Sequence, residues 1–188
     1  GTKLVVAMAG GGADAYPMMR SVLDALPAAQ AEERIALVMV TGPFMPAAER
    51  RELESRAARL RVVVRITVSD PLSYLEAADL IIARAGYNTT MEILRSSTPA
   101  LLIPRSGPSA EQSTRARLFH ERGWIESLHP DGLLSETLAQ AIVGALRRES
   151  APAGYRPDLA PGLPAAVHEL LSPKTPIHQN GSLLRTLA

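Results

Sequence analysis

The chain has 188 residues, of which 46% are hydrophobic, so it is long enough to bury a core and is globular rather than disordered. Its 20 lysine and arginine residues nearly balance 19 aspartate and glutamate residues, which argues against nucleic-acid binding through a basic stripe. The absence of cysteine excludes disulfides, thiolate catalysis and cysteine metal sites, and fits a reducing compartment. No apolar run approaches the roughly 18 residues of a membrane span.

Short apolar strands alternate along the chain with amphipathic helices. Strands are predicted at residues 3–9, 35–41, 61–66, 80–83 and 100–104, and helices at 16–28, 46–60, 71–77, 89–96, 109–122 and 135–147. This alternation predicts an α/β fold, a Rossmann-like doubly wound parallel sheet of about six strands with helices on both faces. In such a fold, ligands bind beyond the carboxyl ends of the strands, where the strand order reverses.

The composition changes near residue 150. Residues 150–188 are rich in proline and glycine, with one short helix predicted at 164–171, so this part is predicted to be a tail that follows a domain at 1–149. Because the sequence begins at Gly1 without an initiator methionine or a signal peptide, we expect it to be part of a longer protein.

The first strand is followed by a glycine-rich turn, which runs from Gly10 to Ala15 and satisfies the pattern G-x-G-x-x-A. Dinucleotide binding also requires an acidic residue at the end of the second strand, but that strand ends in Val40-Thr41-Gly42. Two interpretations are favoured over the dinucleotide site. The turn is either a tight turn without a ligand, or a place where a phosphate approaches the bare backbone.

A second turn follows the strand at 80–83, and its sequence from Arg84 to Glu92 opens a helix. Backbone N–H groups and the partial positive charge of a helix start suit phosphate, and a carboxylate one turn further on can accept two sugar hydroxyls. The arrangement predicts a nucleotide-diphosphate site and therefore an activated sugar as ligand.

A purely structural interpretation competes with this one. Thr89-x-x-Glu92 and Ser109-x-x-Gln112 both match the capping box, in which the later side chain bonds back to the helix start. Against capping alone, both helices follow consecutive strands and would face one crevice, so both interpretations stay open. Asp70-Pro71 is interpreted only as a helix cap followed by proline.

Three segments together carry a family resemblance. They are Arg84-Ala-Gly-Tyr-Asn-Thr-Thr-Met-Glu92, Pro99-Ala-Leu-Leu-Ile-Pro104 and Glu111-Gln-Ser-Thr-Arg-Ala116. In this order they resemble the C-terminal, donor-nucleotide-binding domain of GT-B glycosyltransferases of the MurG type. The glycine turn and Ala78-Asp79 fit the same pattern, and the resemblance covers about residues 3–147.

The resemblance implies a role for each matching position. Glu92 would accept the ribose hydroxyls of a nucleotide, usually uridine, and the main chain near Val68 would contact the base. The diphosphate and the sugar would be held by Gly11, Gly12, Gly86, Tyr87, Asn88, Thr89, Glu111 and Gln112. Gly12 and Ala85 stand where serine is common in the family, so a hydroxyl contact to phosphate is in question. Arg105 has no assigned counterpart. Its place after the fifth strand would allow contact with phosphate or sugar, but a surface arginine is favoured.

The expected function is the donor half of an inverting glycosyltransferase that transfers a hexosyl group from a UDP-sugar to a hydroxyl acceptor. No metal or other cofactor is expected, and no catalytic residue is assigned in this chain, including His120, His129, His168 and His178. The acceptor site and the base are expected in a missing N-terminal domain or a partner chain. The protein is expected to be cytoplasmic, with the full-length protein touching the inner face of the membrane peripherally.

Two alternatives accompany this expectation. The first is a non-catalytic nucleotide-binding or docking module that works with a partner chain and uses the same crevice or the tail. The second is a sugar-nucleotide epimerase with the same architecture. The serine-glycine-glycine run and paired glutamates that are usual in those epimerases are not found between Arg84 and Glu92.

Overall fold

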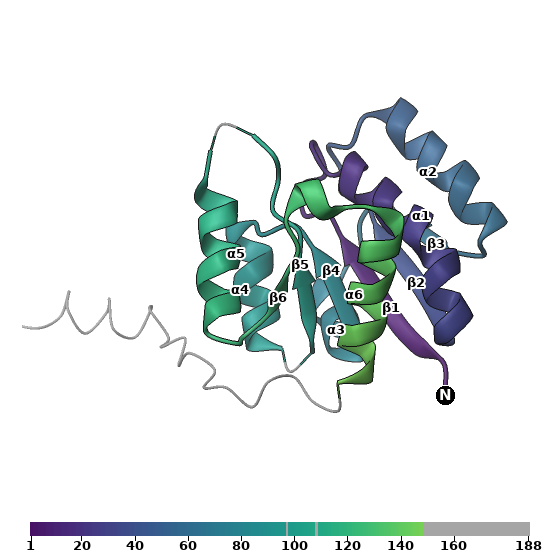
Figure 1. Ribbon diagram of the computed structural model, residues 1–188. Helices are drawn as coiled ribbons and strands as arrows, with labels where there is room; N and C mark the ends of the chain where they lie inside the picture. Colours follow the sequence, from purple (N-terminus) through teal and green to yellow (C-terminus); the bar gives the residue numbers. More distant parts are fainter. Residues whose placement is uncertain (97, 108, 149–188) are drawn as a thin grey trace, which may run out of the picture. The chain divides into compact units, whose positions relative to one another are not determined.

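The structure is a computed structural model that describes residues 1–96, 98–107 and 109–148. These residues form a six-stranded sheet in which all strand pairs are parallel and the order is β3-β2-β1-β4-β5-β6 (Figure 1). The strands are β1 (Lys3–Met8), β2 (Ile35–Val40), β3 (Val63–Arg65), β4 (Leu80–Ala83), β5 (Ala100–Leu102) and β6 (Glu126–Ser127). The helices are α1 (Tyr16–Glu32), α2 (Ala47–Arg59), α3 (Pro71–Ala77), α4 (Tyr87–Arg95), α5 (Glu111–Glu121), the 3₁₀ helix η1 (Pro130–Gly132) and α6 (Ser135–Arg147).

The strand order confirms the predicted doubly wound α/β fold. From β1 the chain moves outward through β2 to β3, and then returns to place β4 on the other side of β1. Val5 shows this central position, since it lies opposite Leu37 of β2 and Leu80 of β4. The reversal between β1 and β4 is the position where ligands bind in folds of this class.

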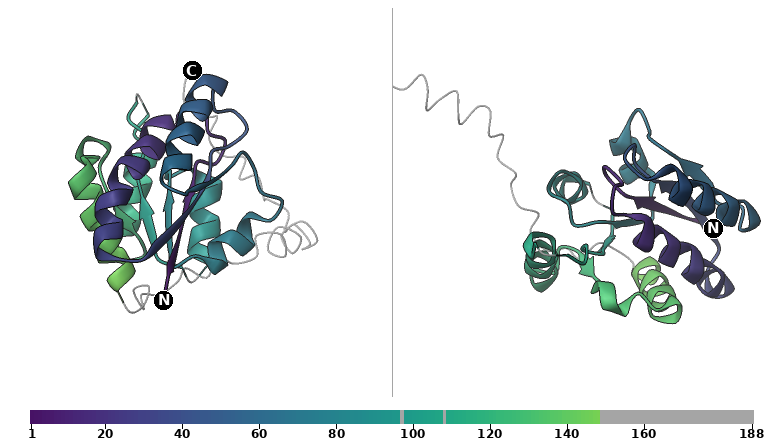
Figure 2. Two further views of the ribbon diagram at one scale, coloured as in Figure 1. Left: turned by 90° about the vertical axis from the view of Figure 1, so that its right-hand side faces the viewer. Right: turned by 90° about the horizontal axis from the view of Figure 1, so that it is seen from above.

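The strands are apolar because the sheet is covered on both faces. Along β1, Val5 and Ala7 join a core cluster with α1, α2 and α6, whereas Val6 and Met8 join a second cluster with α3, α4 and α5. Figure 2 gives two further views of the sheet between its helices. Burial on both faces explains why these strands are continuous apolar runs instead of alternating patterns.

Most predicted helices and strands are present at the expected positions in the chain, but several of them begin or end at other residues than predicted. The predictions at 71–77, 80–83 and 135–147 match α3, β4 and α6 at both ends. Helix α1 continues past the predicted end at residue 28 and through Pro27, because Ala29 still packs into the core. Strand β6 was not predicted, and the tail from residue 150 with its predicted helix lies outside the described residues.

Asp79 connects the amino ends of the two central strands, β1 and β4. Its carboxylate accepts the backbone N–H of Leu4 at 2.8 Å and the Nζ of Lys3 at 3.1 Å. The hydrogen bond from the Leu4 amide, helped by the nearby Lys3 charge, lowers the pKa of Asp79 below its usual value. This contact fixes the register of β1 against β4, and so the relative position of the two turns that follow them.

No helix in the described ranges combines the length and the apolar character that crossing a bilayer would require.

Candidate functional site

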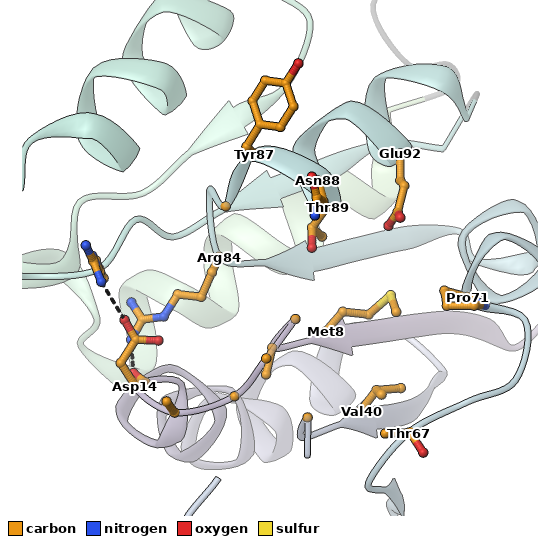
Figure 3. A pocket seen from close by; sticks show the side chains of 18 of the residues that line it. Met8, Asp14, Val40, Thr67, Pro71, Arg84, Tyr87, Asn88, Thr89 and Glu92 are labelled. Carbon is orange, nitrogen blue, oxygen red and sulfur yellow. Dashed lines mark hydrogen bonds and ion pairs between the residues drawn. The ribbon is translucent and has the colours of Figure 1, made fainter. Parts of the chain in front are cut away.

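A cavity of about 650 Å³ opens at the carboxyl edge of the sheet, at the reversal between β1 and β4 (Figure 3). The predicted site residues that line it are Gly11, Gly12, Val68, Gly86, Tyr87, Asn88, Thr89, Glu92 and Gln112. Of the predicted residues only Glu111 is not among the lining residues. Its carboxylate forms an ion pair with Arg115, and its side chain is 65% exposed. The structure therefore brings residues from distant segments to one hollow.

The start of α4 forms one wall of the cavity. The helix begins at Tyr87, with Gly86 as an extended N-cap residue that makes no side-chain capping bond. The first amide that bonds back is that of Thr90, which donates to the Gly86 carbonyl at 2.9 Å. The amides of Tyr87, Asn88 and Thr89 thus have no acceptor within the helix, and they give this wall a partial positive charge.

Glu92 does not take part in a capping box. Because the helix begins two residues before Thr89, the predicted cap at Thr89 is wrong and Glu92 lies too far along α4 to reach the cap. Among the described residues its carboxylate has no hydrogen-bond or ion-pair partner. Figure 3 shows the side chain on the cavity wall. A half-buried carboxylate without a protein partner is available to ligand hydroxyls.

Gln112 also departs from the predicted capping box. The N-cap residue of α5 is Ala110 rather than Ser109, and the Gln112 Oε1 accepts the backbone N–H of Arg105 at 3.1 Å. This bond ties the start of α5 to the segment that follows β5. With its oxygen used in this way, Gln112 presents its NH₂ group as the donor available to a ligand in the cavity.

The glycine turn after β1 packs tightly against the turn after β2. Gly12 has a φ of +91°, and a Cβ there would lie 2.1 Å from the Thr41 carbonyl oxygen. The backbone N–H of Phe44 donates to the Gly11 carbonyl at 2.9 Å and joins the same two turns. Packing alone therefore requires glycine at position 12, and the serine that is common in the family would not fit this turn.

Two arginines lie beside this turn. Arg84 is only 8% exposed, and its guanidinium donates to the carbonyl oxygens of Pro104 at 3.0 Å and Asp14 at 2.6 Å. Burial lowers the pKa of Arg84. Sequence reasoning assigned no role to Arg84, yet its position directly after β4 already placed it at the carboxyl edge of the sheet.

Arg105 is partly exposed, as expected for a surface arginine, and it also lies at the cavity. Its side chain is 41% exposed, but it lines the cavity, and its Nη1 lies 3.8 Å from the Asp14 carboxylate. It directly follows the segment that continues β5, which is the position that allowed a ligand contact as the alternative to a surface arginine.

The end of the cavity that lies opposite Asp14 and Arg84 has fewer charged side chains. Thr67, Val68 and Pro71 line it, and Figure 3 shows Pro71 and Glu92 away from Asp14 and Arg84. The predicted cap before α3 is confirmed, because Asp70 accepts the Ser73 N–H at 3.3 Å and Pro71 occupies the first helical turn. The hydrogen bond from the Ser73 hydroxyl lowers the pKa of Asp70.

Neither described histidine lies at the cavity. His120 contacts the Ile125 carbonyl at 3.2 Å, and His129 accepts the Asp131 N–H at 3.3 Å in its own turn. Within residues 1–96, 98–107 and 109–148, no three side chains of histidine, aspartate or glutamate gather as metal ligands. His168 and His178 lie outside the described residues.

Residues 5–155 match the glycosyltransferase family 28 C-terminal domain. The chain belongs to this family. An uncharacterized glycosyltransferase of Methanosarcina mazei is 29% identical over 172 residues, covering 89% of this chain and 42% of that protein. A Bacillus subtilis protein, UDP-N-acetylglucosamine--N-acetylmuramyl-(pentapeptide) pyrophosphoryl-undecaprenol N-acetylglucosamine transferase, is 29% identical over 141 residues, covering 74% of this chain and 39% of that protein.

The MurG crystal structure from Acinetobacter baumannii has the same fold. It superposes with a TM-score of 0.61 at 22% identity, covering 82% of this chain and 47% of that one. The chain therefore spans less than half the length of each of these proteins. These findings confirm the resemblance to the C-terminal domain of GT-B glycosyltransferases of the MurG type.

Proposed function

We propose that this chain binds the UDP-sugar donor of an inverting glycosyltransferase, which transfers a hexosyl group to a hydroxyl acceptor. The observation that carries the proposal is the Glu92 carboxylate, which has no partner among the described residues and shares a cavity with the free amides of α4. The cavity of about 650 Å³ falls in the range of small-molecule sites, roughly 300–1,000 Å³. The B. subtilis relative is named for a UDP-sugar donor.

In this proposal the donor lies along the cavity. Glu92 accepts the ribose hydroxyls, and the backbone near Thr67 and Val68 contacts the base. The diphosphate lies between the glycine turn and the start of α4, where a Cβ on Gly10 would be only 3.5 Å from Thr89 Oγ1. The sugar then extends toward Gln112.

The chemistry of this half is neutralisation of the leaving diphosphate. When the glycosidic bond to the diphosphate breaks, negative charge builds on the terminal phosphate, and preorganised amides at the start of α4 stabilise it without having to reorganise. No metal or other cofactor is part of the proposal. A base that deprotonates the acceptor hydroxyl is assigned to an acceptor-binding domain or to a partner chain, and no residue of this chain is assigned that role.

Exposed apolar side chains at the carboxyl edge support this division of labour. Phe44, Ile66, Leu72 and Tyr87 are between 45% and 72% exposed, and each follows the carboxyl end of a strand. Large apolar residues exposed along one edge of a sheet fit a surface that another domain covers. We assign this surface to the acceptor-binding domain. A cytoplasmic protein with peripheral membrane contact fits an acceptor linked to undecaprenol, as named for the B. subtilis relative.

Calorimetric titration of the chain with UDP, using Glu92→Gln, tests the proposal. Loss of the carboxylate should weaken UDP binding by about 1–3 kcal/mol, because the ribose hydroxyls lose a charged acceptor. The free energy of unfolding should change by less than about 0.5 kcal/mol, since the Glu92 carboxylate bonds to no described residue.

The matched control is Glu76→Gln, which removes an exposed carboxylate of α3 that does not line the cavity. It should leave UDP binding unchanged. Full UDP affinity in Glu92→Gln, or no binding of any nucleotide at millimolar concentration by the unaltered chain, would favour the docking module.

A further inference from the structure

We propose that Asp14, Arg84 and Arg105 form an anion subsite at the end of the cavity opposite Glu92, in which Arg105 leaves Asp14 and pairs with anionic oxygens of the donor. The assignment of the ligand as a donor rests on the proposed function. The anionic oxygens belong either to the terminal phosphate of the diphosphate or to a carboxylate on the sugar, as in a hexuronate.

Arg84 is the fixed part of this subsite. Its side chain is more than nine-tenths buried, and it bridges the turn after β1 to the segment after β5 through the Asp14 and Pro104 carbonyls. Its Nε is buried but has no acceptor among the described residues. A buried donor of a charged group without an acceptor is costly, and Arg84 lines the cavity, so its positive charge favours an anion bound there.

Arg105 is the part that moves. Its only described ion-pair partner is Asp14, at 3.8 Å, which is too long for a strong charge-assisted hydrogen bond. Its Nε is likewise buried without an acceptor in the described part of the chain. Because both side chains are nearly half exposed, the pair is weak and an incoming anion can compete for the guanidinium.

The net charge at this end of the cavity favours a ligand anion. Two guanidinium groups face one carboxylate here, so the subsite has an excess of one positive charge before the helix start is counted. The Arg105 amide is also the donor that holds Gln112, the residue assigned to the sugar. The positive charge is therefore located where the terminal phosphate and the sugar of the donor would lie.

The test measures the affinity of the full 188-residue chain by calorimetry for five probes: UMP, UDP, UDP-glucose, UDP-glucuronate and inorganic pyrophosphate. The variants are Arg105→Gln and Asp14→Asn, neither of which removes the Asp14 carbonyl that holds Arg84. Arg117→Gln is the control, because Arg117 is an exposed ion-paired arginine of α5 that does not line the cavity. Urea unfolding of each variant separates binding effects from folding effects.

The two variants should act in opposite directions. Arg105→Gln should weaken binding about three- to tenfold, since a half-exposed charged hydrogen bond is lost. Asp14→Asn should tighten it about two- to fivefold, because Asp14 no longer competes for Arg105. A loss confined to UDP-glucuronate identifies a sugar carboxylate, whereas a loss shared by UDP, both UDP-sugars and pyrophosphate, but not UMP, identifies the terminal phosphate.

Several results would overturn the anion subsite. One such result is an Arg105→Gln variant whose affinity for every probe is unchanged. Another is an Arg105→Gln variant that loses as much affinity for UMP as for UDP. A third is weaker binding of the probes by Asp14→Asn. If the unaltered chain binds pyrophosphate through Arg105 but binds no uridine nucleotide, the anion subsite stands and the proposed function fails. Binding of none of the five probes refutes both.

Discussion

Replacing Gly12 by alanine should destabilise the fold, because two independent features require glycine at this position. The φ of +91° lies where residues with a side chain are strained, at a cost of about 1–3 kcal/mol. A Cβ would also lie 2.1 Å from the Thr41 oxygen and 3.1 Å from the Gly42 Cα, and both are backbone atoms that a rotamer change cannot move. Displacing that turn adds about 1–3 kcal/mol of overpacking.

We therefore expect Gly12→Ala to lower the free energy of unfolding by about 2–6 kcal/mol, a large part of the roughly 5–15 kcal/mol of a typical domain. Urea denaturation followed by far-UV circular dichroism measures the change. Gly11→Ala is the matched control, because Gly11 has no positive φ and its Cβ would meet only the Phe44 ring, at 3.3 Å, on a side chain that is 72% exposed. Equal stabilities of the two variants would refute the packing argument.

Two further changes test the sugar end of the site and the strand register. Gln112→Ala should alter the ranking of UDP-sugars but leave UDP affinity nearly constant, because its NH₂ group faces the sugar; an equal loss for UDP in calorimetry would count against a sugar contact. Asp79→Asn should cost about 1 kcal/mol at pH 7, since the half-exposed Asp79 carboxylate loses its charged bonds to Leu4 and Lys3. The folded pKa of Asp79 is below its usual value of 3.8, so this stabilisation is present above that pH and is lost as the pH falls through the folded pKa. Acid titration of unfolding should then show a weaker pH dependence in the variant, and identical profiles would contradict this role.

The elements that sequence reasoning found are those whose side chains are buried by the sheet. The strand 80–83 was predicted to the residue, because all its side chains are apolar and buried on both faces. Strand β6 was not predicted, since Glu126 and Ser127 are polar, half buried and too few to show a period. Two residues of strand depend on pairing with Leu101 and Leu102, which only the folded sheet provides.

The start of α4 shows why a local rule failed at the site. The capping-box rule assumes that a side chain satisfies the first amides of a helix, and it therefore selected Thr89. In the structure Gly86 precedes the helix and provides no side-chain acceptor, which leaves those amides facing the cavity. Helix starts can be satisfied by ligands as well as by side chains. The capping-box rule is derived from helices whose first amides are satisfied by their own side chains. It is therefore expected to misplace the start of a helix whose first amides bind a ligand.

The positive end of the cavity depends on strand order, which explains why sequence reasoning assigned no role to Arg84 and did not favour a ligand contact for Arg105. Asp14 follows β1, Arg84 follows β4 and Arg105 follows the segment that continues β5, and the order β1-β4-β5 makes these three ends neighbours. In the chain Asp14 and Arg84 are 70 residues apart, so no local pattern joins them. The two arginines also differ in what they hold. Arg84 ties loops together, whereas Arg105 holds only a weak pair, so the charge at position 105 can change which anion is bound while the sheet that builds the cavity stays the same.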